Sequence, residues 1–332
     1  MNADEMCQHP LNRLRLDHPE QLLPEWLQLF EKDRELATRL INDPQLEFPV
    51  LFSLKDDIEV RGIELNPRMQ IALAHTRNVL KGAEDGFQSD SSFADQHDLV
   101  VDSLLWILRT GWNTILSTDY VQVIDQTAIQ VLLTYNQDWV REMVDLIVYR
   151  YKNRSQRHYL ISALLETSKP VYLIYLANYL LSDQTVESGY AHRLLAFIPE
   201  VRHSTSNKSA FLAFENWYEE NEHYLVYTGV TNDAFPGGVP YRIHFGAKYL
   251  GKAVDPGTGE PRQILLPEER DHYLAFLKLP RKIQVALSSY SVHLRKQQPN
   301  DWQSWIERPL SEQAAPFRSL LHRGEMNTYD YR

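Results

Sequence analysis

The 332-residue sequence contains a single cysteine, Cys7. One thiol forms no intramolecular disulfide and has no second thiol with which to chelate a metal, so the composition excludes a disulfide-stapled secreted fold. Only His9 lies near enough in the sequence to activate Cys7, which argues against a catalytic thiolate. This cysteine usage indicates a reducing compartment, and we expect a cytoplasmic protein.

Long apolar runs are also absent. The longest one, Val171–Leu181, covers about eleven residues and contains Asn178, whereas a helix needs about 20 apolar residues to cross a bilayer. The first six residues are acidic and polar and lack the basic and apolar regions of a secretory signal. We therefore expect no membrane contact and no secretory leader.

The sequence lacks the short motifs that bind phosphates or metals or activate nucleophiles. The stretch Gly257–Gly259 is followed by neither a Lys-Ser/Thr pair nor a helix, which indicates a hairpin turn rather than a phosphate loop. Glu200 and His203 have the spacing of a helical metal-ligating pair, but they follow Pro199 and no second pair is present. Nucleophile elbows, zinc-protease motifs and kinase motifs are missing too. We expect no metal and no cofactor.

Charge is distributed unevenly along the chain, whose net charge is −10. Residues 1–100 contain 19 Asp and Glu against 10 Lys and Arg, whereas residues 231–332 contain 11 against 14. Nucleic-acid binding needs clustered Lys and Arg, so the acidic first third argues against nucleic-acid binding by the whole molecule. A local contact through a basic groove stays open.

Helical periodicity dominates what is present. Apolar residues recur at helical steps in five segments: 119–135, 139–151, 156–166, 171–181 and 186–198. Ser168 is expected to cap the fourth segment and Pro199 to stop the fifth. Alternate helices start about 31 to 37 residues apart, which is the length of a two-helix unit in HEAT- or TPR-like arrays. The sequence predicts an all-α fold, either a HEAT/TPR-like helical-pair solenoid or an irregular helical array.

Proline and glycine set the expected helix ends before the array. A helical stretch from Asp17 ends at Asn42–Pro44, because the residue before a proline avoids helical backbone. Phe48–Phe52 is expected to be a short connector or a helix edge. Pro67 opens a helix that ends at Gly82, with proline inside the start and glycine past the end.

The helical pattern stops after residue 223. Tyr224–Val230 and Tyr241–Phe245 alternate as strands do, and clusters of turn-forming residues follow each of them. The helical pattern resumes at Pro267, and the tail from His322 is expected to be loose. The sequence thus predicts four regions: N-terminal helices (1–82), a helical-repeat array (97–223), a β-containing, loop-rich insertion (224–266) and C-terminal helices with a polar tail (267–332).

The array contains a candidate partner-binding surface. Arginines cluster just before a helix whose tyrosines fall on one face, and a groove that contains both would bind an acidic peptide or stack bases. The candidate residues are Arg150, Arg154, Arg157, Tyr172, Tyr175 and Tyr179. Core tyrosines beside a solvated loop are the alternative interpretation.

The insertion contains the candidate for catalysis. Asp233, Arg242 and His244 lie within a dozen residues, and they would supply an acid/base histidine and an anion-binding arginine if they converged. Such a trio also arises by chance. This site would belong to an enzyme that acts on a small molecule or a nucleic acid.

Fold and surface together favour a binding protein. Solenoids present extended surfaces to other proteins, so we expect a non-enzymatic cytoplasmic scaffold or adaptor with a protein partner. The step from fold to function is an analogy. The enzyme at the 224–266 insertion is the alternative, and nucleic-acid binding through the arginines at 150–157 is a third hypothesis.

Overall fold

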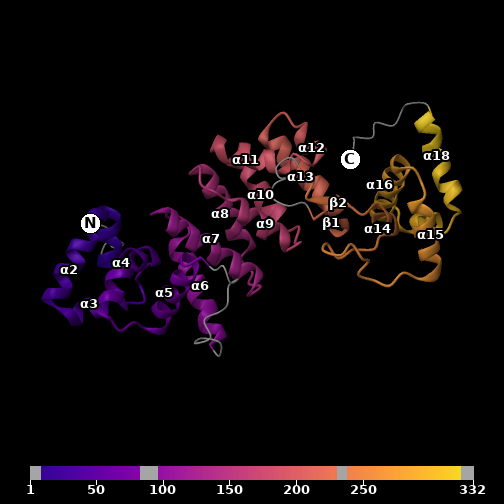
Figure 1. Cartoon of the computed structure of the whole chain (residues 1–332). Coiled ribbons are helices and arrows are strands. Elements are labelled where there is room, and N and C mark those ends of the chain that lie inside the picture. Colours follow the sequence, from indigo (N-terminus) through magenta and orange to yellow (C-terminus); the bar gives the residue numbers. More distant parts are fainter. Residues whose placement is uncertain (1–8, 83–95, 230–237, 323–332) are drawn as a thin grey trace. The chain divides into compact units, whose positions relative to one another are not determined.

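The computed structural model describes residues 9–82, 96–229 and 238–322, and these residues are mostly helical (Figure 1). Contacts between Cα atoms divide the chain into two compact units, Met1–Trp139 and Val140–Arg332. The all-α prediction is confirmed, since a two-stranded sheet is the only sheet among the described residues. The boundary between the two units falls inside the helical-repeat array predicted for residues 97–223. The solenoid arrangement and the four predicted regions stay predictions.

The first unit consists of helices that share an apolar core. In chain order they are α1 (Pro10–Asp17), η2 (Pro19–Gln21), α2 (Leu22–Lys32), α3 (Arg34–Ile41), α4 (Phe48–Arg61), α5 (Pro67–Leu80), α6 (His97–Gly111) and α7 (Thr118–Leu133). Tyr120 of α7 packs against two rings of α4, with its ring centroid 5.7 Å from that of Phe48 and 5.0 Å from that of Phe52. Burial of these rings stabilises the contact between α4 and α7.

One expectation for this unit is resolved and another needs correction. Phe48–Phe52 is the first part of the long helix α4, as the helix-edge alternative predicted, and not a connector; Pro49 occupies the first turn, where a missing N–H costs nothing. The N-terminal helical stretch is interrupted at Asp33, whose backbone leaves the helical region. The Asp33 side chain accepts a hydrogen bond from the Leu36 N–H at 2.9 Å and starts α3 as its cap.

The second unit begins with helices at the positions that periodicity predicts. They are α8 (Val140–Lys152), α9 (His158–Glu166), α10 (Tyr172–Asn178), η4 (Tyr179–Leu181), α11 (Thr185–Leu195), α12 (Pro199–Arg202), α13 (Asn207–Asn221) and η5 (Glu222–Tyr224). α8 packs against α9, α10 and α11, and α13 packs against α10, α11 and α12.

One predicted helix end in this unit is wrong, and another has a second role. Ser168 does not cap α10, because its φ of 54° places it in the left-handed region and the helix begins only at Tyr172. Pro199 not only follows α11 but also begins α12, where it occupies the first turn.

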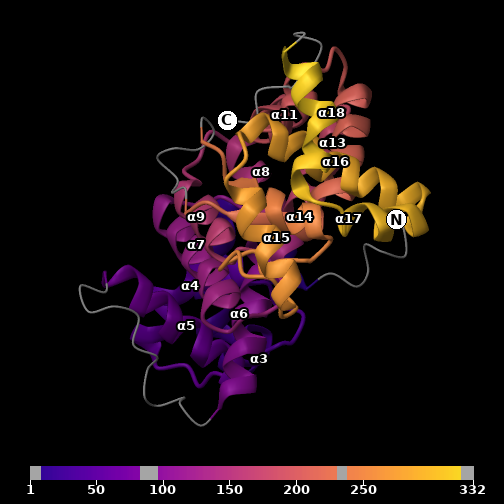
Figure 2. The same ribbon diagram turned by 90° about the vertical axis from the view of Figure 1, so that its right-hand side faces the viewer.

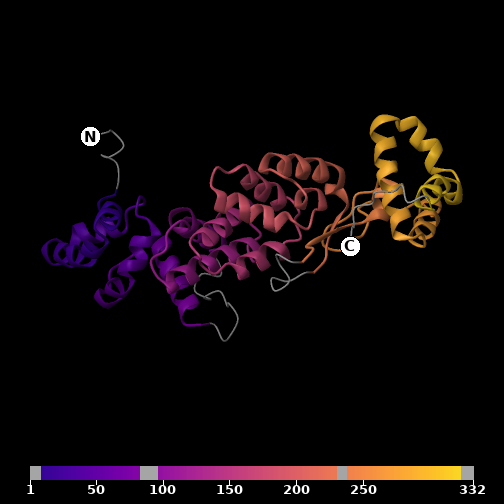
Figure 3. The ribbon, with the colours of Figure 1, turned by 90° about the horizontal axis from the view of Figure 1, so that it is seen from above.

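A small sheet follows the helices. The alternation correctly predicts two strands, β1 (Leu225–Tyr227) and β2 (Tyr241–Ile243), and the structure pairs them antiparallel. The second predicted strand is shorter than expected, because Phe245 already belongs to α14 (Phe245–Leu250). The turn after α14 lies beside the sheet (Figure 3), where the Tyr227 N–H donates to the Pro256 carbonyl at 2.7 Å.

The C-terminal helices pack around α16. They are α15 (Pro267–Leu277), α16 (Arg281–Gln297), α17 (Pro299–Ile306) and α18 (Leu310–His322). α16 packs against α14, α17 and α18 (Figure 2), and the Ser291 hydroxyl donates to the Tyr249 carbonyl at 2.6 Å. The tail predicted to be loose begins at His322, which the structure places at the end of α18; the rest of it, residues 323–332, lies outside the described residues.

A buried lysine joins α14 to α13. Lys248 is only 2% exposed, and its ammonium contacts Glu220 Oε1 at 2.5 Å and Asn221 Oδ1 at 2.7 Å. Burial is the main cause that lowers the pKa of Lys248, and the carboxylate of Glu220 opposes that effect. A buried ammonium needs such partners, so this contact fixes how the C-terminal helices meet the end of α13.

Candidate functional site

Two arginines and two tyrosines form a compact cluster in the second unit, in which Arg193 is exposed, Tyr151 and Arg157 are half-buried and Tyr190 is buried beneath them. This arginine–tyrosine cluster consists of Tyr151 near the end of α8, Arg157 at the start of α9, and Tyr190 and Arg193 on α11. The two tyrosine rings are stacked, with centroids 3.9 Å apart and planes 5° apart. Because Tyr190 and Arg193 are three residues apart on a helix, they lie on the same face.

Both guanidinium groups lie over the stacked rings. Arg157 is 4.8 Å from the Tyr151 centroid and 5.3 Å from that of Tyr190, while Arg193 is 5.1 Å and 5.2 Å away. Arg157 Nε also donates to the Tyr190 hydroxyl at 3.0 Å. Cation–π contacts of this kind contribute about 0.5–1 kcal/mol each at exposed sites, so the two arginines are positioned in advance of any ligand.

The cluster carries positive charge that no described carboxylate neutralises. Arg157 and Arg193 have no ion-pair partner in the described part of the chain, and the same holds for the exposed Arg154. The nearby Lys152 differs, because its ammonium pairs with Glu187 at 2.7 Å. Burial raises the pKa of Tyr190, while Arg157 and Arg193 oppose that shift, so this hydroxyl stays protonated at neutral pH.

The structure brings only part of the predicted partner-binding set to this surface. Arg157 belongs to the cluster, and Arg154 lies in the turn just before it with a φ of 55°. Arg150 is completely buried and Tyr172 is 3% exposed, so neither side chain is at the surface. Arg150 and Tyr172 could contact a partner only if the helices that cover them moved apart, and the predicted groove assumed no such movement.

The remaining predicted tyrosines also lie apart from the cluster. The Tyr179 hydroxyl donates to Asp145 Oδ1 at 2.7 Å, and burial raises its pKa. Tyr175 is half-buried. Tyr172 packs instead against Tyr241 of β2, with centroids 6.0 Å apart, so this face of α10 supports the sheet.

Sequence reasoning missed Tyr151, Tyr190 and Arg193. The spacing of Tyr190 and Arg193 was visible, but the stack pairs residues 39 positions apart, and only the packing of α8 on α11 brings them together. Helical periodicity places residues on a face of one helix and does not say which two helices meet there.

Only part of the catalytic candidate is described. Asp233 lies outside the described residues, and Arg242 is exposed on β2. His244 caps α14, because its Nδ1 accepts from the Ala247 N–H at 3.1 Å, and its Nε2 lies 3.2 Å from the Tyr273 hydroxyl. Burial lowers the pKa of His244, so its ring is neutral at pH 7. Acid–base chemistry would have to break one of these two hydrogen bonds, and the enzyme hypothesis stays a prediction.

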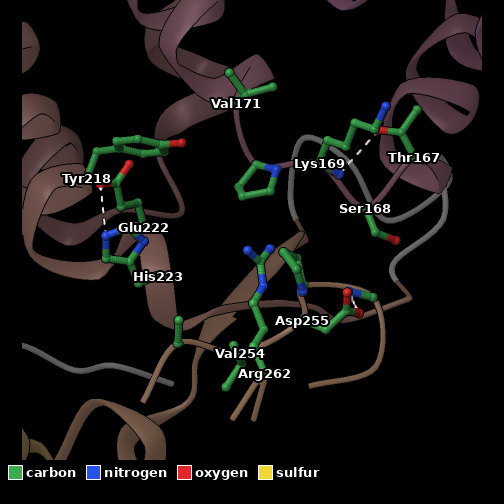
Figure 4. Close-up of a pocket in the computed structure, with 14 residues that line it drawn as sticks. Thr167, Ser168, Lys169, Val171, Tyr218, Glu222, His223, Val254, Asp255 and Arg262 are labelled. Carbon is green, nitrogen blue, oxygen red and sulfur yellow. Dashed lines mark hydrogen bonds and ion pairs between the residues drawn. The ribbon is translucent and has the colours of Figure 1, made fainter. Parts of the chain in front are cut away.

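A cavity of about 660 Å³ opens elsewhere in the second unit (Figure 4). Three segments line it: the turn before α10 (167–171), the end of α13 with η5 (218–223), and the turn after α14 (253–262). Figure 4 shows the Arg262 guanidinium and the Tyr218 hydroxyl directed into this space. We refer to it below as the α10–α13 cavity.

The described residues include no group of three or more His, Cys, Asp or Glu side chains placed to bind a metal ion. None of the described helices combines the length and the apolar character needed to cross a membrane. No family model matches the chain, and no curated protein or solved structure shows significant similarity to it. Functional inference therefore rests on the sites themselves.

Proposed function

We propose that this chain is a non-enzymatic cytoplasmic scaffold that binds an acidic segment of a protein partner at the arginine–tyrosine cluster. In this proposal helices α8 to α13 act as a helical-pair array, and the ends of α8 and α11 present the binding surface. The observation that carries it is the pair of guanidinium groups on one tyrosine stack, without carboxylate partners among the described residues.

The chemistry of the cluster favours carboxylates as ligands. A guanidinium that lies on an aromatic ring can still form paired hydrogen bonds with a carboxylate through its edge N–H groups. In Arg157 the Nε–H already donates to the Tyr190 hydroxyl and Nη1 donates to the Ser155 carbonyl at 3.2 Å, so a carboxylate would bind the remaining Nη N–H groups of Arg157 and those of Arg193. Hydrogen bonds to charged groups contribute about 1.5–3 kcal/mol each, so two such contacts would supply much of the binding energy of a short peptide. The exposed Tyr159, at 63%, adds an apolar surface on the neighbouring helix α9.

Charge favours a peptide over a nucleic acid. A nucleic-acid site commonly neutralises about 6–10 phosphates, whereas this surface offers Arg154, Arg157 and Arg193 on a chain of net charge −10. The overall negative charge would repel a long polyanion more strongly than a short acidic peptide.

The test is fluorescence anisotropy of the full chain with a labelled glutamate-rich peptide. We expect saturable binding, a loss of about tenfold or more in affinity for R157Q/R193Q, and no binding of the matching glutamine peptide. R270Q/R308Q is the matched control, because it removes the same charge from exposed arginines outside the cluster. Equal losses in both double variants would reject the site, and preference for an oligonucleotide would support the nucleic-acid hypothesis instead.

A further inference from the structure

We propose that the α10–α13 cavity binds a small organic anion, with Arg262 as its ion-pair partner and Tyr218 as a hydroxyl donor. The volume of about 660 Å³ falls within the range of about 300–1,000 Å³ that is typical of small-molecule sites. The proposal is independent of the peptide-binding function, since no residue of the arginine–tyrosine cluster lines this cavity.

The carboxylates of the cavity have closer partners than its cations do. Neither Lys169 nor Arg262 forms an ion pair within the described ranges, although the charge of Arg262 contributes to lowering the pKa of the Asp255 carboxyl. Asp255 Oδ1 accepts from the backbone N–H groups of Gly257 at 3.0 Å and Thr258 at 2.9 Å. Glu222 lies 3.5 Å from the imidazole of His223. This imbalance favours an anionic ligand over a cationic one.

Arg262 is anchored so that its side chain reaches the cavity. Its backbone N–H donates to the Ala253 carbonyl at 2.8 Å, next to the β-bridge between Val254 and Pro261. The guanidinium extends from this bridge toward the middle of the cavity (Figure 4). Holding the backbone at the start of this side chain reduces the entropy lost when the guanidinium pairs with a ligand.

Tyr218 supplies a neutral donor on the opposite wall. Its ring stacks on Phe214 of the same helix, with centroids 5.5 Å apart, and its hydroxyl points into the cavity (Figure 4). Burial, followed by the charge of Glu222, raises the pKa of Tyr218 to about 12. The hydroxyl therefore stays protonated at neutral pH and can donate to an anion.

The other residues that line the cavity indicate the chemical character of the rest of the ligand. Part of the cavity wall is apolar and consists of Pro170, Val171, Val254 and Pro256. Because an apolar wall favours an apolar ligand surface, the ligand should have one charged group and an apolar body. Ser168 stands at the rim with a φ of 54°, an unfavourable backbone conformation of the kind that collects at binding sites. A carboxylate or a phosphate monoester meets this description.

The test is isothermal titration of the full chain with benzoate, phenyl phosphate and inorganic phosphate, with benzylamine as the cationic control. We expect saturable binding of benzoate or phenyl phosphate, weakened about tenfold by R262Q and less by Y218F. Tighter binding of phenyl phosphate assigns a phosphate ligand, and tighter binding of benzoate a carboxylate. R270Q, on α15 outside the cavity, should bind as the parent does.

Several outcomes would overturn the proposal. These are unchanged affinity in both R262Q and Y218F, preference for benzylamine, or no saturation by any of the three anions. Arg262 is exposed, so its replacement leaves no buried hole, and matching thermal unfolding of R262Q and R270Q would show that a loss of binding is local.

Discussion

At the scale of single residues, two glycines should respond in opposite ways to the same change. A methyl group on Gly111 would lie 2.5 Å from the Tyr120 hydroxyl, which donates to the Gly111 carbonyl at 2.9 Å. Gly111→Ala should therefore lower the free energy of unfolding by about 1–3 kcal/mol through overpacking. Urea denaturation followed by circular dichroism measures this change.

The matched change is Gly189→Ala, within α11. No atom lies within 4 Å of a methyl group placed there, so alanine should raise the free energy of unfolding by about 0.5–1 kcal/mol through its higher helix propensity. A stabilising Gly111→Ala would contradict the close contact of α6 with Tyr120.

His75 makes the stability of the first unit depend on pH. It is buried, and its Nε2 donates to Thr127 Oγ1, 2.7 Å away, since that hydroxyl already donates to the Val123 carbonyl. Burial lowers the pKa of His75 from 6.5 to about 4. Above pH 6.5 the ring is neutral in both states, and below it the unfolded chain takes up a proton that the folded chain excludes.

The stability of the first unit should therefore fall as the pH drops from 6.5 toward 4, by about 3 kcal/mol in total. Urea denaturation at a series of pH values tests this, with H75Q as the comparison. The variant should lose much of the pH dependence, and an equal slope in both proteins would show that His75 is not its source.

At the scale of elements, the contact of α13 with α14 should depend on Lys248. Lys248→Met keeps the side-chain volume but leaves Asn221 Oδ1 without its donor, and Asn221 is 3% exposed. The expected loss is about 1–3 kcal/mol in the free energy of unfolding. Thermal or urea denaturation of the full chain measures it.

Lys296→Met is the control variant for Lys248→Met. Lys296 of α16 contacts Glu219 of α13 at 2.8 Å, but both side chains are largely solvent-exposed. Exposed ion pairs contribute little, so this variant should unfold much as the parent does. A larger effect at Lys296 than at Lys248 would mean that the buried ammonium is not what joins the two helices.

Element positions were largely predictable, because apolar periodicity and turn residues are local signals. Asn66 caps α5 through the Met69 N–H at 3.0 Å, directly before the proline that the sequence marks as a start. The predictions failed where tertiary contacts decide. Ser168 has a capping side chain but lies in a left-handed turn, which no local pattern indicates.

The candidate site was less predictable than the fold. Arg154 and Arg157 stand out as charges in a short loop, and the structure leaves both without a described carboxylate partner. The aromatic neighbours of Arg157 come from α8 and α11, whereas Tyr172, which shares a predicted face with Tyr175, is buried against Tyr241 of the sheet. Which helices meet is a property of the whole core and not of any one segment.

At the scale of the whole molecule, the chain is negatively charged and mostly helical, and its described residues include a local basic surface at the arginine–tyrosine cluster. Arg157 and Arg193 lie over a rigid aromatic support, and in the proposed function the net charge of −10 would disfavour long polyanions as ligands. A scaffold of this kind would select a partner through a short acidic segment, and added salt should weaken that contact.

The most direct measurement of this claim locates the peptide on the protein. The full chain is photo-cross-linked to a glutamate-rich peptide that carries one benzoylphenylalanine, and the attached residues are identified by mass spectrometry. The account predicts attachment within residues 151–159 and 190–193, lost in R157Q/R193Q and retained in R270Q/R308Q. Attachment confined to other segments, or an undiminished yield in R157Q/R193Q, would contradict it.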